Sequence, residues 1–152
     1  AAMAIFHALP VKVVFSGFGC RMILSEKHRL SYRQNAVISL AGPLGNLALA
    51  SVFFVLNPEN QIAIQSNLAL GILHLLPIEP LDGGLAVHAF LRGKIAAGKA
   101  DKICLVLSIT LLLPLSILGF LILLQTRYNF SLLALSIYLM LYLVLGRNFL
   151  PL

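Results

Sequence analysis

The segment at residues 74–84, HLLPIEPLDGG, interrupts a chain that is otherwise apolar enough to lie in a bilayer. It contains two carboxylates, Glu79 and Asp82, and two prolines that break the helical hydrogen-bond pattern. An ionised Asp in hydrocarbon needs a counter-charge, a metal or a water-filled cavity, so Asp82 is a candidate functional residue. Irregular backbone at membrane depth also requires burial in protein or a cavity. The alternative is an aqueous turn between two helices, because Pro and Gly also mark turns.

The composition predicts an integral, multi-pass membrane protein. Hydrophobic residues make up 60% of the 152 positions and charged residues 11%, whereas a soluble domain is about half apolar and about one quarter charged. The net charge of +6 comes from basic residues in short connections between apolar runs. They are therefore interpreted as membrane-topology signals and not as a nucleic-acid surface. The lipid bilayer is an expected partner, and no nucleic acid is expected.

The pattern of apolar runs predicts an all-α multi-span membrane protein with a short β-hairpin near the N-terminus. About four spans are expected. Residues 35–56 and 103–124 are uncharged and long enough to cross a bilayer, and 130–146 is at the short end. Residues 61–91 form a span broken at the Pro/Gly segment. Residues 11–24 are rich in β-branched and aromatic side chains with glycines, which is typical of a hairpin.

The chain is expected to form a single membrane-embedded domain over residues 1–152. Within it, residues 1–92 carry the hairpin and the motif-bearing spans, and residues 93–152 contain two C-terminal spans. Lys and Arg concentrate at 21–33 and 92–102, which places both segments on the cytoplasmic side.

Two motifs in this order resemble those of the site-2 protease family of intramembrane zinc metalloproteases. Residues 77–84, PIEPLDGG, are similar to the end of the family's Asn-x-x-Pro-x-x-Pro-x-Asp-Gly motif, and residues 41–46, AGPLGN, to its Gly-Pro-x-x-Asn signature. The likeness covers about residues 1–92 and is to the small bacterial type akin to the sporulation factor-processing protease. It implies zinc as cofactor, a bacterial cell membrane as location, Asp82 as the third zinc ligand, and Asn46 as a residue that holds the core or the substrate strand.

The sequence departs from the family pattern in two places. The first zinc motif, His-Glu-x-x-His, is absent, so the general-base Glu and two His ligands are expected upstream of Ala1 and no catalytic residue is expected within the chain. His74 stands where the motif has Asn, which puts substrate positioning in doubt. The residues that the resemblance assigns to substrate binding or to holding the core are Asn46, His74, Pro77, Pro80 and Gly83.

The function expected from these features is intramembrane zinc metalloendopeptidase activity on a membrane-spanning or membrane-proximal peptide. As a fragment without the first zinc motif, the chain alone is expected to be inactive. One alternative is a small transporter or channel subunit that binds an ion at the broken helix, as carriers do. Another is a catalytically dead relative that binds a transmembrane partner. An intact His-Glu-x-x-His upstream would distinguish the protease from both.

Overall fold

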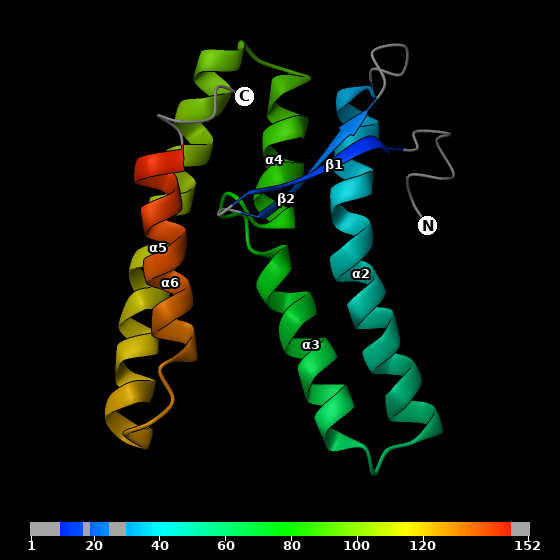
Figure 1. Ribbon diagram of the computed structural model, residues 1–152, viewed down its shortest axis with the longest axis vertical. Coiled ribbons are helices and arrows are strands. Elements are labelled where there is room, and N and C mark those ends of the chain that lie inside the picture. The colour runs from blue at the N-terminus through cyan, green and yellow to red at the C-terminus, as the bar shows by residue number, and fades with distance from the viewer. Residues whose placement is uncertain (1–9, 17–18, 25–29, 147–152) are drawn as a thin grey trace.

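The computed structural model describes residues 10–16, 19–24 and 30–146. Two short strands, β1 (Pro10–Ser16) and β2 (Gly19–Leu24), pair antiparallel with an irregularity after Pro10. They lie in the range where the sequence predicts a hairpin. Five helices, α2 to α6, make up most of the remainder (Figure 1).

Helix α2 (Tyr32–Leu56) begins at a capping box, in which the Ser31 hydroxyl accepts from the Gln34 backbone N–H and the Gln34 side chain accepts from the Ser31 backbone. The helix continues through Pro43. Helix α3 (Gln61–Leu75) packs against α2. A Cβ on Gly71 of α3 would lie 3.2 Å from the Pro43 carbonyl oxygen, so this glycine lets α3 approach the AGPLGN segment closely.

The chain breaks at residues 76–81 and resumes as helix α4 (Asp82–Arg92). Both prolines of the segment lie in the break, and Asp82 is the first residue of α4. Inside the break Ile78 is fully buried and Leu81 is nearly so. These two side chains belong to a hydrophobic core with Leu112, Leu139 and Leu143. The loop before Asp82 is therefore anchored in the protein interior.

Helix α5 (Ala97–Thr126) continues through Pro114 and packs against α6 (Ser131–Leu141), which ends in a π-helical turn (Tyr142–Gly146). A Cβ on Gly119 would lie 2.7 Å from the Leu133 backbone nitrogen. The backbones of α5 and α6 thus come close together at this glycine. In Figure 1, α3 and α4 lie between α2 and the α5–α6 pair.

The expectation of about four spans is wrong for the part of the chain that the structure describes. Two helices, α2 and α5, are long and apolar enough to cross a membrane, with mean hydropathies of 1.8 and 2.6. Helix α3 has 15 residues, and α6 with its π-helical turn forms a shorter apolar helix over Ser131–Leu145. At about 1.5 Å per residue each is about 22 Å long. A hydrocarbon core is about 30 Å thick, so neither crosses it. The prolines end α3 too early for a span.

Candidate functional site

The carboxylate of Asp82 lies where three helices meet. His74 is in the last turn of α3, and its Nδ1 is 3.0 Å from Oδ2 of Asp82. On α2, a Cβ placed on Gly42 would be 3.6 Å from the same oxygen. The structure therefore brings together the two segments of the sequence that carry the family resemblance.

The contact between His74 and Asp82 orients one carboxylate oxygen. Because an ionised carboxylate only accepts hydrogen bonds, Nδ1 of His74 is the donor to Oδ2 when Asp82 is ionised. The N-terminus of α4 favours a negative charge at its first residue. Both side chains remain more than one third exposed, His74 at 39% and Asp82 at 37%. Both side chains are therefore partly accessible to a ligand.

Two glycines directly after Asp82 allow α4 to begin at this place. A Cβ on Gly83 would collide with the carbonyl groups of Leu75 and Leu76, and a Cβ on Gly84 with the carbonyl group of Ile78. The colliding atoms are backbone atoms and cannot rotate away. Gly83 and Gly84 therefore hold the first turn of α4 against the end of α3 and against the loop.

The other residues that the resemblance assigns to the site are distributed around it. Pro77 and Pro80 lie in the loop at 76–81, and the bond between Glu79 and Pro80 is cis. Asn46 is half-buried on α2, and among the described residues its side chain has no hydrogen-bond partner. Its role in holding the core or a substrate stays a prediction.

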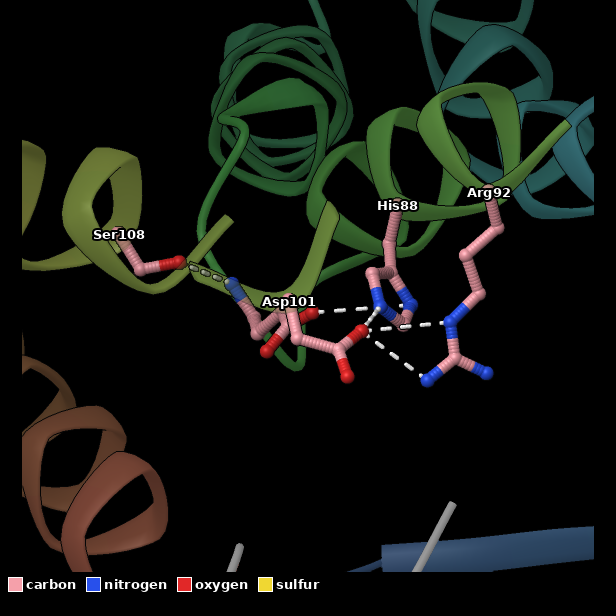
Figure 2. Close-up of polar contacts among 5 residues, drawn as sticks. His88, Arg92, Asp101 and Ser108 are labelled. Carbon is pink, nitrogen blue, oxygen red and sulfur yellow. Dashed lines mark hydrogen bonds and ion pairs between the residues drawn. The ribbon is translucent and has the colours of Figure 1, made fainter. Parts of the chain in front are cut away.

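A second polar cluster was not expected from the sequence. It consists of Glu79, His88, Arg92 and Asp101, which we call the joint cluster (Figure 2). Nε2 of His88 lies 2.7 Å from Oδ1 of Asp101, and Arg92 donates to the same oxygen from Nε at 3.3 Å and from Nη2 at 3.0 Å. Nδ1 of His88 faces Oε1 of Glu79 at 3.8 Å. Glu79 and His88 are buried.

The joint cluster could not be predicted from the sequence because its members come from three elements. Arg92 and Asp101 were assigned to one basic loop, but Arg92 ends α4 and Asp101 lies in the second turn of α5. The available signal was the spacing of His88 and Arg92, since residues four apart share one helix face. Glu79 belongs to this cluster, and its carboxylate faces Nδ1 of His88.

Ser108 ties the loop to α5 and gives a first prediction. Its side chain is fully buried, and its Oγ accepts the backbone N–H of Glu79 at 3.0 Å. Ser108→Ala should lower the free energy of unfolding by about 1–3 kcal/mol, because a buried N–H loses its acceptor. The matched control is Thr110→Ala on the same helix, whose exposed hydroxyl bonds only its own helix backbone. Denaturant titration in detergent should show a smaller loss for the control, and equal losses would contradict this assignment.

The chemistry of Asp82 and His74 fits a part of a zinc ligand set. Zinc binds carboxylate oxygens and imidazole nitrogens, and a catalytic zinc takes three protein ligands. In the part of the chain that the structure describes, no group of three or more His, Cys, Asp or Glu side chains is placed to hold a metal. Asp82 can therefore contribute to a zinc site only together with ligands from outside the described residues.

Comparisons with known proteins agree with a metalloprotease relationship for a part of the chain. A protein of Methanocaldococcus jannaschii, whose name assigns it provisionally to the zinc metalloproteases, is 40% identical over 67 residues. The alignment covers 38% of this chain and 35% of that relative, so the chain spans about a third of the relative's length. No family model matches the sequence.

Proposed function

We propose that the protein acts as an intramembrane zinc metalloendopeptidase and cleaves a membrane-spanning or membrane-proximal peptide. The observation that carries this proposal is the position of Asp82: its carboxylate is held by His74 and lies against Gly42, where the two resemblance segments meet. The partial similarity to a protein named as a zinc metalloprotease supports the same reaction class.

In this proposal each residue at the site has a separate task. Asp82 would be one zinc ligand through its carboxylate. His74 orients the carboxylate, as partners of metal ligands commonly do. The remaining ligands and the general-base Glu would come from a His-Glu-x-x-His motif upstream of Ala1. When bound, zinc would supply Lewis-acid chemistry for polarising a peptide carbonyl and activating water.

The surfaces of α2 and α5 favour a membrane location for this activity. Only 11% and 17% of their most apolar windows are buried inside the protein. Large apolar side chains such as Phe54, Val106 and Phe120 are exposed. In water such patches would be unusually large for a monomer, whereas in lipid they need no protein cover. We therefore place the protein in the cell membrane as a multi-pass protein.

The experiment that tests this function uses the full-length protein in lipid vesicles with a membrane-spanning peptide. Cleavage should stop when a zinc chelator is added and return when zinc is restored. Cleavage that persists after the metal has been removed would contradict the proposal. Ion flux across the vesicles without any cleavage would favour the transporter alternative.

His74 provides a prediction specific to the site. His74→Asn should retain zinc affinity and cleavage within about ten-fold, because the Asn amide can donate from nearly the position of Nδ1. His74→Leu has no donor and should lower zinc affinity about 10–100-fold, the usual cost of losing a group that orients a ligand. Zinc titration of the full-length variants measures both. If His74→Asn and His74→Leu lower the zinc affinity equally, the site needs Nε2 of His74, and the orienting role of Nδ1 is wrong.

A further inference from the structure

Helix α4 connects two packed groups of helices. Within the described chain, α2 packs against α3 and α4, while α5 packs against α6. The contact between the two groups is made by α4 and by the loop that precedes it, which inserts Ile78 and Leu81 beside Leu112 of α5. Asp82 is the first residue of α4, so its position depends on how α4 is oriented against α5.

The joint cluster connects α4 to α5 through the carboxylate of Asp101. Oδ1 of Asp101 takes hydrogen bonds from His88 and from Arg92, which lie one turn apart on α4. Figure 2 shows both side chains directed from the same helix toward Asp101. Two bonds at different heights on one helix restrain rotation about its axis as well as translation. Ser108 adds a third attachment from α5, to the backbone of Glu79.

A small rotation of α4 would move the Asp82 carboxylate by a distance that matters for metal binding. Side-chain ends lie about 5 Å from a helix axis, so a rotation of about 10° displaces them by about 1 Å. Functional groups need to be held to within about 0.5 Å. The other supports of the carboxylate are the hydrogen bond from the partly exposed His74, the contact with Gly42, and the packing of Gly83 and Gly84 on the backbone of α3 and of the loop.

We propose that Asp101 is a positioning residue for Asp82, which acts through His88 and Arg92 by fixing the rotation of α4. This inference rests on the proposed function, because its consequence is the zinc affinity of the site. Asp101 itself touches neither the metal nor the substrate. Its carboxylate orients the helix that presents the ligand.

The test measures the zinc dissociation constant of the full-length protein by competition with a chelator of known affinity. Asp101→Ala should raise the Kd about ten-fold or more, the effect typical of lost outer-shell support. Asp101→Asn keeps an acceptor oxygen for His88 and Arg92 and should recover most of the affinity. Lys102→Ala is the matched control, because it removes an exposed neighbouring charge on the same helix and should leave the Kd unchanged.

A purely structural role for Asp101 gives a different result. In that case Asp101→Ala would lower the unfolding temperature while the folded protein keeps its normal zinc Kd, and the inference would be overturned. If Asp101→Ala does not fold, the pair His88→Gln and His88→Leu decides instead. The Gln amide can donate to Asp101 and should keep the affinity, whereas Leu should weaken it. Equal affinities in this pair would also overturn the inference.

Coupling between the two residues provides a further check. If His88 and Asp101 act as one unit, the double variant His88→Leu with Asp101→Ala should raise the Kd no more than the larger single change. Fully additive effects would contradict a shared action. A wild-type protein that neither binds zinc nor cleaves peptide would overturn the proposed function together with this inference. Normal zinc binding and cleavage in wild type and Asp101→Ala alike would overturn the positioning role only.

Discussion

Gly84→Val is expected to abolish the assembled site and to destabilise the fold by about 3 kcal/mol or more, at the upper end of overpacking effects. A Cβ at this position would collide with the backbone of Ile78 and Glu79. Ile78 is fully buried in the core that the loop forms with α5 and α6, so the loop cannot move away. Either α4 separates from the loop, or its first turn unwinds and displaces Asp82.

Gly45→Ala is the matched control for this substitution. Gly45 lies inside α2, and a Cβ there would meet nothing within 4 Å. Ala is favoured over Gly inside a helix by up to about 1 kcal/mol, so this variant should be as stable as wild type or slightly more so. Denaturant titration of both variants measures the difference. Wild-type stability and zinc affinity in Gly84→Val would show that α4 does not pack against the loop as described.

Asp82→Ala has the second large expected effect, which is loss of peptide cleavage to background in the full-length protein with the fold retained. The side chain is 37% exposed, and the substitution removes a charge without leaving a buried partner unpaired. Stability should therefore change little. Glu59→Gln is the control, because it neutralises an exposed carboxylate in the turn between α2 and α3 and should leave cleavage unchanged.

Cleavage rates and the unfolding transition, measured on the same preparations, separate the chemistry from folding. If Asp82→Ala loses cleavage only because the protein no longer folds, the metal role has no support from this variant. If cleavage continues at the wild-type rate in a folded Asp82→Ala protein, Asp82 is not a ligand.

The sequence alone predicted the secondary-structure elements that are determined by neighbouring residues in the chain. The end of α3 follows from Pro77 and the Pro/Gly segment. The long apolar helices α2 and α5 follow from the uncharged runs 35–56 and 103–124. Asp82 could also be named as a candidate functional residue, because a carboxylate in apolar surroundings needs a reason. Its role as a zinc ligand was implied by the family resemblance and stays a prediction. The sequence did not predict that Asp82 is the first residue of α4. That position depends on the packing of Gly83 and Gly84 on neighbouring backbone.

Tertiary contacts explain what the sequence could not predict. Glu79, His88 and Asp101 are separated along the chain and meet only because α4 packs on α5. The hydrogen bond from His74 to Asp82 depends on the turn of the loop between them. The number of spans was overestimated because the broken segment 61–91 and the run 130–146 were both counted as spans. The break leaves α3 and α4 as two short helices, and Ser131–Leu145 is a shorter apolar helix.

The most direct test of the account is the zinc content of the full-length protein, measured by elemental analysis beside Asp82→Ala and Asp82→Asn. The account predicts about one zinc per chain in the wild type and loss of most of the metal in Asp82→Ala. Asp82→Asn should also lose zinc, because the amide keeps the shape of the side chain but not its charge. Full zinc occupancy in Asp82→Ala, with the protein folded, would contradict the central claim that Asp82 is a ligand of a catalytic zinc.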